Sequence, residues 1–123
     1  MFEAQYMHVE AAGTLTIYGP WFTPGGAHGR FTVDIIQILN SATLEVEVLT
    51  KNTETAGDTG TLIADSGTLT AVGQHPFAPS TLGPTHSTLE LVRYKYTLSV
   101  ESGGPGLALF RMLPPVWFDA VKA

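Results

Sequence analysis

The sequence predicts an all-β protein, a single antiparallel β-sandwich with jelly-roll-like connections and about eight strands. Two observations lead to this prediction. Apolar and polar residues alternate in several segments, as they do in strands with one buried face. Thirteen glycines and eight prolines interrupt almost every stretch long enough for a helix. Without helices to cover a parallel sheet, two packed antiparallel sheets are the expected architecture.

Residues 1–123 are expected to form one domain, because this length suits a single core and is too short for two. Hydrophobic residues make up 44% of the sequence, so their burial can offset the conformational entropy lost on folding.

The first half of the chain contains the clearest predicted strand pair. Residues 14–18 alternate and end at Gly19-Pro20. Residues 30–39 and 43–51 also alternate, and Asn40-Ser41 lies between them. This spacing predicts a tight hairpin.

The second half contains the longest predicted strand, residues 88–100. A Gly- and Pro-rich stretch at 102–106 separates it from an extended segment at 107–112, which predicts a second hairpin. Tyr94 and Tyr96 are expected on the inward face of the long strand. Weaker strands are expected at residues 5–10, 61–64 and 67–72.

Composition excludes several classes of function. The net charge is −5 and no basic stripe is present, so nucleic-acid binding is not expected. The absence of cysteine removes disulfides, thiolate metal sites and cysteine nucleophiles. The N-terminus does not resemble a signal peptide, and no apolar run of about 18 residues predicts a membrane span. We therefore expect a soluble product made in the cytoplasm.

The histidines do not predict a metal site, because none of them forms a close pair with ligand spacing. Glycine-containing stretches at 25–29, 58–60 and 65–67 are predicted to be turns rather than phosphate or calcium loops. No serine lies in a nucleophile-elbow motif. The four histidines are His8, His28, His75 and His86.

Glu45 and Glu47 lie two residues apart on one strand face, and the predicted hairpin places Asp34 near them. Paired carboxylates can hydrolyse glycosides. However, these acids lie on the polar side of an amphipathic segment, and no apolar pocket is evident that would raise a carboxyl pKa. We therefore expect no catalytic residue, no cofactor and no enzymatic activity.

Large apolar side chains gather in two loops and at the chain end, where they suggest contact with partner proteins. The long loop 73–85 and the proline-stiffened tail 114–123 are predicted docking segments. Trp117 is expected to lie in the core, whereas Trp21 and Phe22 are expected to be exposed. The candidate interface residues are Trp21, Phe22, Phe77, Leu82, Pro114, Pro115, Trp117 and Phe118.

Four segments carry a resemblance to a known family: residues 31–36, 43–53, 92–100 and 109–111. With the acidic loop 54–60, their pattern resembles the small β-sandwich decoration proteins, or cement proteins, of tailed-bacteriophage heads. The resemblance spans roughly residues 14–118 and is one of strands and turns.

This resemblance implies a structural virion protein that binds the outer shell of the capsid and stabilises it. The implied partners are the major capsid protein and further copies of the chain, in a homo-oligomer that could be a trimer. The protein would be made in the host cytoplasm and reside on the capsid surface. The family has no catalytic residues.

Two other classes of function remain open. In a carbohydrate-binding module, Tyr18, Trp21 or Phe22 would stack on sugar rings. A flat, exposed aromatic platform beside polar residues would favour that reading, whereas apolar patches on several faces would favour the structural role. An enzyme built on a barrel is the third possibility.

Overall fold

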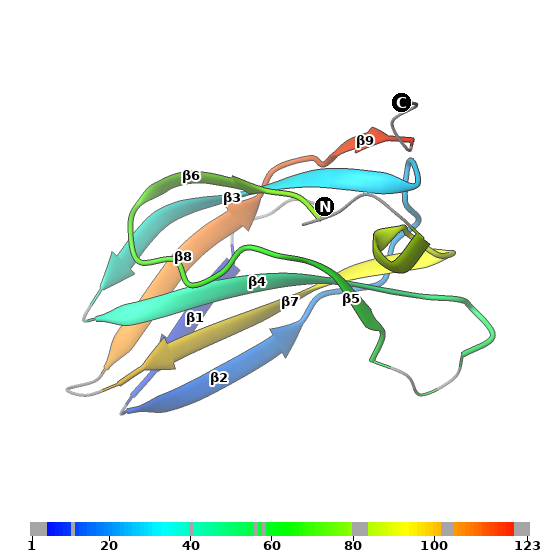
Figure 1. Ribbon diagram of the computed structural model, residues 1–123. Helices are drawn as coiled ribbons and strands as arrows, with labels where there is room; N and C mark the ends of the chain where they lie inside the picture. Colours follow the sequence, from blue (N-terminus) through cyan, green and yellow to red (C-terminus); the bar gives the residue numbers. More distant parts are fainter. Residues whose placement is uncertain are drawn as a thin grey trace.

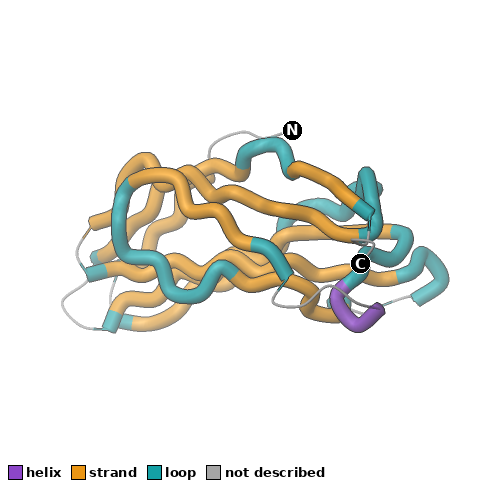
Figure 2. Tube along the Cα trace, turned by 45° about the horizontal axis from the view of Figure 1, so that its top comes forward, coloured by secondary structure: helices purple, strands orange, loops and turns teal. Residues whose placement is uncertain are grey.

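The computed structural model describes residues 5–10, 12–39, 41–55, 57, 59–79, 84–101 and 105–119. Strands form the body of the molecule, and a short 3₁₀ turn lies at one end (Figure 2). The elements in chain order are β1 (Gln5–Val9), β2 (Gly13–Tyr18), β3 (His28–Leu39), β4 (Ala42–Lys51), β5 (Thr61–Asp65), β6 (Gly73–Phe77), η1 (Pro84–His86), β7 (Leu91–Val100), β8 (Gly106–Met112) and β9 (Val116–Phe118). Among the described residues, no helix is long and apolar enough to cross a membrane.

The strands form two antiparallel sheets that pack face to face (Figure 1). Sheet A has the order β1-β8-β3-β6, and β9 pairs with the beginning of β3. Sheet B has the order β2-β7-β4-β5. The strands pair first with last, as in one long antiparallel hairpin that is wrapped around a core: β1 with β8, β2 with β7, β3 with β6 and β4 with β5. This is the jelly-roll arrangement. The predicted all-β sandwich is confirmed.

Both predicted hairpins are wrong. β3 does not pair with β4, because β3 lies in sheet A and β4 in sheet B. The chain crosses from one sheet to the other near Ser41, whose φ of 59° is in the left-handed region. β7 and β8 are separated in the same way. An amphipathic strand buries the same face whether the next strand lies beside it or opposite it, so alternation alone does not distinguish a hairpin from a crossing. Asn40 lies outside the described residues.

Two further predictions about segments are corrected. The segment 67–72 is not a strand: after Gly67, whose φ is 71°, Leu69 makes one isolated bridge to Leu44. Residues 73–77, predicted as part of a loop, form β6. β6 is an edge strand, and this position tolerates Pro76, which has no amide hydrogen to donate.

The core lies between the two sheets and contains a connected group of aromatic rings. Phe31 of sheet A contacts Tyr94 of sheet B edge-on, with a centroid distance of 6.0 Å. Tyr96 of sheet B contacts Phe110 of sheet A at 5.0 Å. Phe31 and Phe110 are fully buried. These rings bury large apolar surfaces and join the two sheets near their middle.

We expect Phe110→Ala to lower the free energy of unfolding by about 3–5 kcal/mol, because it leaves a cavity at the contact with Tyr96. The neighbouring Leu109→Ala, on the half-exposed outer side of the same strand, should cost only about 1 kcal/mol. Urea denaturation measures both values. Equal losses would contradict the assignment of inner and outer faces.

Candidate functional site

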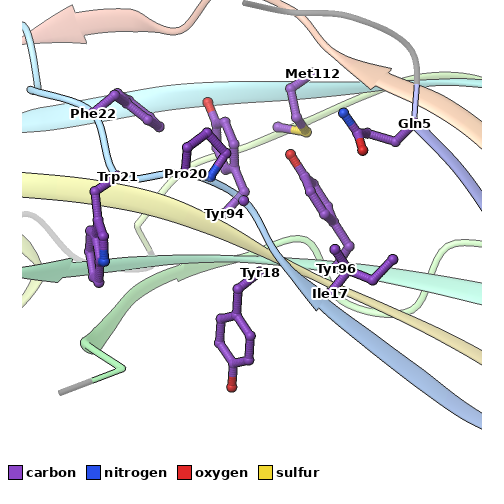
Figure 3. Close-up of a pocket in the computed structure, with 10 residues that line it drawn as sticks. Gln5, Ile17, Tyr18, Pro20, Trp21, Phe22, Tyr94, Tyr96 and Met112 are labelled. Carbon is purple, nitrogen blue, oxygen red and sulfur yellow. The ribbon is translucent and has the colours of Figure 1, made fainter. Parts of the chain in front are cut away.

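A cavity of about 340 Å³ lies between the two sheets at the side where β1 and β2 are the edge strands. Its walls come from β1, the end of β2, the loop that follows β2, β7 and β8. Figure 3 shows the aromatic rings and Met112 that surround it. We call it the aromatic pocket. The side chains that reach it from the inner side of the sandwich include Phe22, Tyr94, Tyr96 and Met112, whereas Tyr18 and Trp21 border it with their rings turned outward.

The backbone of the loop after β2 determines which way its aromatic residues point. Gly19 N–H donates to the Tyr94 carbonyl at 2.8 Å, and Phe22 exchanges two backbone hydrogen bonds of 2.8 Å with Val92. The loop therefore follows β7 like an irregular strand. Phe22 consequently points inward, 5.4 Å from the Tyr94 ring, and Trp21 points to the outer side of sheet B.

Two buried tyrosines line the pocket. Tyr94 is 5% exposed and Tyr96 is 6% exposed. In Figure 3 the Tyr96 hydroxyl points toward Met112, whereas the Tyr94 hydroxyl points toward sheet A on the side of Phe22. Among the described residues, the buried Tyr94 Oη has no hydrogen-bond partner. Burial raises the pKa of Tyr96 to about 12, and burial followed by the proximity of Tyr96 raises the pKa of Tyr94 further still. Both hydroxyls therefore remain protonated near neutral pH.

Cations cover the outer aromatic rings beside the pocket. The Arg93 guanidinium carbon lies 4.4 Å from the Tyr18 ring centroid and 4.3 Å from that of Trp21. Lys51 Nζ lies 5.0 Å from the Trp21 centroid. The guanidinium also donates to the Thr59 carbonyl at 2.9 Å. Cation–π contacts of this kind stabilise the loop against sheet B, and they place cations over the Tyr18 and Trp21 rings.

The carboxylates are distributed differently from the prediction. Asp34 lies in sheet A and accepts a hydrogen bond from Arg111 Nε at 3.1 Å, so its predicted position near Glu45 is wrong. Glu45 instead shares the outer side of sheet B with Glu47 and with Asp65 of β5. The pKa of Glu45 is raised to about 7. Partial burial is the largest cause, followed by the hydrogen bond with Asp65, repulsion from Asp65 and repulsion from Glu47, while Lys95 opposes the shift. One proton shared in this group relieves the repulsion.

The outer face of sheet A carries an apolar patch, which we call the sheet A patch. In the strand register, Tyr6 lies opposite Leu109 and Leu39 lies opposite Leu107. Ile36 protrudes at the β-bulge between Ile35 and Gln37. Tyr6 is 61% exposed, Ile36 45% and Leu39 41%.

The outer face of sheet B has a different composition. Its outward positions carry mostly threonine, serine and charged side chains. The polar ones are Thr14, Thr16, Thr43, Glu45, Glu47, Lys95, Thr97 and Ser99, and Tyr18 at the end of β2 lies on the same side with 43% of its surface exposed.

The structure brings some of the predicted interface residues together in its own core. Trp117 is half-buried and meets Phe31 edge-on at 5.7 Å, as expected for a core residue. Trp21 and Phe22 are half-buried, and their predicted exposure is wrong. Phe77 is half-buried at 5.7 Å from Phe31.

The predicted docking tail begins with part of the fold. Val116–Phe118 form β9, and Phe118 stacks on the buried His28 at 5.8 Å. Pro114 is exposed and Pro115 is half-buried. Residues 120–123 and Leu82 lie outside the described residues. No group of three His, Cys, Asp or Glu residues in the described part of the chain could hold a metal ion.

Several candidate site residues did not emerge from the sequence. Tyr94 and Tyr96 were predicted to point inward. A buried tyrosine hydroxyl needs a polar partner, so two inward tyrosines on one strand indicate a polar position within the core. Leu107 and Leu109 alternate with Ala108, Phe110 and Met112, so both faces of that segment are apolar. This pattern could have indicated a covered outer face.

The comparisons with known proteins identify no family. Family models, curated proteins and solved structures were all searched, and none matches this chain.

We expect the cluster of acidic side chains formed by Glu45, Glu47 and Asp65 to make the free energy of unfolding depend on pH. The pKa of Glu45 is raised in the folded protein, so its stabilising proton is fully bound below about pH 4.5 and is lost as the pH rises through about 7. The free energy of unfolding should therefore decrease over this interval. Glu45→Gln should remove this part of the dependence, as measured by urea denaturation at several pH values.

The matched control for this measurement is Glu54→Gln, in the exposed turn after β4. It should keep the pH profile of the unchanged protein. A Glu45→Gln profile that is parallel to that of the unchanged protein would contradict the role of the Glu45–Asp65 contact.

Proposed function

We propose that this protein is a non-catalytic structural component of a virus particle, a capsid decoration protein of a tailed bacteriophage. It would bind the assembled shell and stabilise it by protein–protein contact. Its partners would be the major capsid protein and other copies of the chain. The observation that supports this proposal best is the difference between the two outer sheet faces.

Sheet B has the outer face expected of a domain surrounded by water, whereas sheet A exposes paired apolar side chains. Tyr6 and Leu109 are cross-strand neighbours, as are Leu39 and Leu107. Contiguous exposed apolar surface is unfavourable in water and is typical of contact sites.

The surroundings of the sheet A patch also fit a protein interface. The ion pair between Arg111 and Asp34 lies one row further along β8 and β3. On the same face, His8 lies opposite Leu107 with its Nδ1 3.5 Å from Glu10, and Gln37 lies opposite Leu109. An apolar centre bordered by polar groups is the usual anatomy of a protein–protein contact.

The fold agrees with this role but does not select it, because jelly rolls occur both in viral capsid proteins and in lectins. The aromatic side chains are more informative. In a sugar-binding platform the Tyr18 and Trp21 rings would stack on the sugar, but Arg93 lies over both rings and Lys51 lies over Trp21, which reduces the ring area free for stacking. Contact with a protein shell is therefore the better-supported proposal.

The proposal is tested by adding the purified protein to heads that lack it, prepared from the phage that encodes the chain, and sedimenting the heads. We expect the unchanged protein to sediment with the heads and to raise their resistance to heat. Leu109→Asp should weaken binding about tenfold or more, because it places an unpaired carboxylate in the centre of the contact.

The matched control is Thr16→Asp, which introduces the same charge on the exposed outer face of sheet B. It should bind the heads as the unchanged protein does. Circular dichroism and urea denaturation establish that both variants are folded. Failure of the unchanged protein to sediment with heads, or equal binding of the two variants, would overturn the proposal.

The carbohydrate-binding alternative makes an opposite prediction. It requires retardation on gels that contain polysaccharide, and loss of this retardation in Trp21→Ala. A structural protein should migrate equally with and without polysaccharide. Retardation that depends on Trp21 would favour the alternative.

A further inference from the structure

Strand β2 forms one edge of sheet B (Figure 1). β7 pairs with one side of β2, and no strand in the described part of the chain pairs with the other side, which we call the open edge. Backbone groups of successive residues point to opposite sides of a strand. Gly19 N–H donates to the Tyr94 carbonyl on β7, so Ile17 and every second residue before it also face β7. The backbone N–H and C=O groups that face the open edge therefore belong to Thr14, Thr16 and Tyr18.

The open edge lacks the features that usually prevent a further strand from pairing. Edge strands are commonly protected by a charged residue, a proline or a bulge. At the opposite side of the sandwich, β6 contains Pro76, and β5 contains Asp65 and pairs with β4 across a register shift. β2 contains no Asp, Glu, Lys, Arg or Pro, and its register with β7 is regular. Its backbone is therefore available to another strand.

The exposure of Ile17 marks the place where such a strand would lie. Ile17 is the cross-strand neighbour of Tyr96, so its side chain is on the inner side of sheet B, where it borders the aromatic pocket. Nevertheless, 37% of Ile17 is exposed. The inner face of a sandwich strand is normally covered by its neighbours on both sides. The exposed flank of Ile17 therefore indicates a vacant strand position beside the pocket.

We propose that the open edge of β2 binds an extended segment of a partner protein, which adds an antiparallel strand to sheet B and places one uncharged aromatic side chain in the aromatic pocket. In strand addition, main-chain hydrogen bonds supply affinity and pockets select the side chains. The residue of the segment opposite Thr16 exchanges backbone hydrogen bonds with it, and the residue opposite Ile17 points inward. This site is separate from the sheet A patch and does not depend on the proposed structural function.

The lining of the pocket determines which inward side chain it accepts. Phe22, Tyr96 and Met112 offer aromatic and sulfur contacts that suit a ring. Gln5 and the Tyr96 hydroxyl supply uncharged polar groups, which suit the hydroxyl tip of a tyrosine. No charged side chain is among the described residues of the lining, so a carboxylate placed there would lose its hydration without compensation. A tyrosine therefore fits this position and an aspartate does not.

A second copy of this chain fits the open edge less well than an extended segment. Two β2 strands could pair about a two-fold axis, but the inner side of β2 belongs to its own sandwich, where Leu15 packs against the core. A second copy would therefore bring its own sheet A and cover the pocket without filling it. An extended segment has no second layer, so its inward side chain is free to enter.

The probe is the peptide Lys-Thr-Val-Thr-Tyr-Thr-Val-Thr-Lys, acetylated and amidated at its ends, whose tyrosine and valines lie on one side of the extended chain. It is titrated into the full-length protein, and backbone amide NMR shifts are followed. We expect saturable shifts in residues 14–18 and in Gln5, Tyr96 and Met112. Aspartate in place of the tyrosine should weaken binding about tenfold or more.

Two doubly N-methylated peptides test the strand pairing itself. In the antiparallel arrangement, the threonines on either side of the tyrosine direct their N–H groups at β2, whereas the tyrosine and the second valine direct theirs away. N-methylation of those two threonines should weaken binding about tenfold or more, because it removes two main-chain hydrogen bonds. N-methylation of the tyrosine and the second valine is the matched control and should leave the affinity nearly unchanged.

A substitution in the protein tests the same hydrogen bonds from the other side. Thr16→Pro removes an N–H that faces the open edge and leaves the hydrogen bonds to β7 in place, and an edge strand tolerates proline at such a position. It should weaken peptide binding about tenfold. Thr16→Val keeps the N–H and should bind as the unchanged protein does. The amide spectrum of each variant reports its fold.

Three results would overturn the proposal. The first is the absence of saturable shifts in residues 14–18, and the second is equal affinity of the two N-methylated peptides. The third is a dimer of the unchanged protein in sedimentation that Thr16→Pro converts to a monomer, because it would assign the open edge to a second copy.

Discussion

Tyr94 and Tyr96 lie on the inner side of β7 and join the two sheets through edge-on contacts with phenylalanines of the opposite sheet. Tyr94 meets Phe31 at an interplanar angle of 86°, and Tyr96 meets Phe110 at 62°. The rings provide the apolar contact that a sandwich core requires. Among the described residues, however, the buried Tyr94 hydroxyl has no hydrogen-bond partner in that core. The same two residues therefore hold the sheets together and make one side of the interior chemically distinct.

The jelly-roll winding gives this pair its surroundings. Because successive strands alternate mostly between the sheets, residues distant in sequence meet at the β1–β2 side: Gln5, the loop that contains Phe22, and Met112 all line one cavity. Arg93, next to Tyr94 on β7, points the other way and binds the outer rings of Tyr18 and Trp21. One strand thus has an apolar, uncharged pocket on its inner side and the cations Arg93 and Lys95 on its outer side.

Local alternation was enough to predict the fold class and most strand positions. It was not enough to predict which strands are neighbours. A strand buries its apolar face equally well whether the next strand in the chain pairs with it in the same sheet or joins the opposite sheet. The predicted approach of Asp34 to Glu45 failed for this reason. Similarly, the contact between Tyr6 and Leu109 joins strands about a hundred residues apart, and no local pattern specifies it. The orientation of Trp21 and Phe22 depends on hydrogen bonds between their loop and β7, which the sequence of the loop does not reveal.

The proposed structural role requires a partner to cover the sheet A patch while the outer face of sheet B stays in water. Hydroxyl-radical footprinting of the protein, free and bound to phage heads, tests this directly because it reports the solvent access of individual side chains. We expect labelling of Tyr6, Leu107 and Leu109 to fall strongly on binding and labelling of Tyr18 to stay constant. Unchanged labelling of Tyr6 on bound protein, or protection of Tyr18 in its place, would contradict the claim.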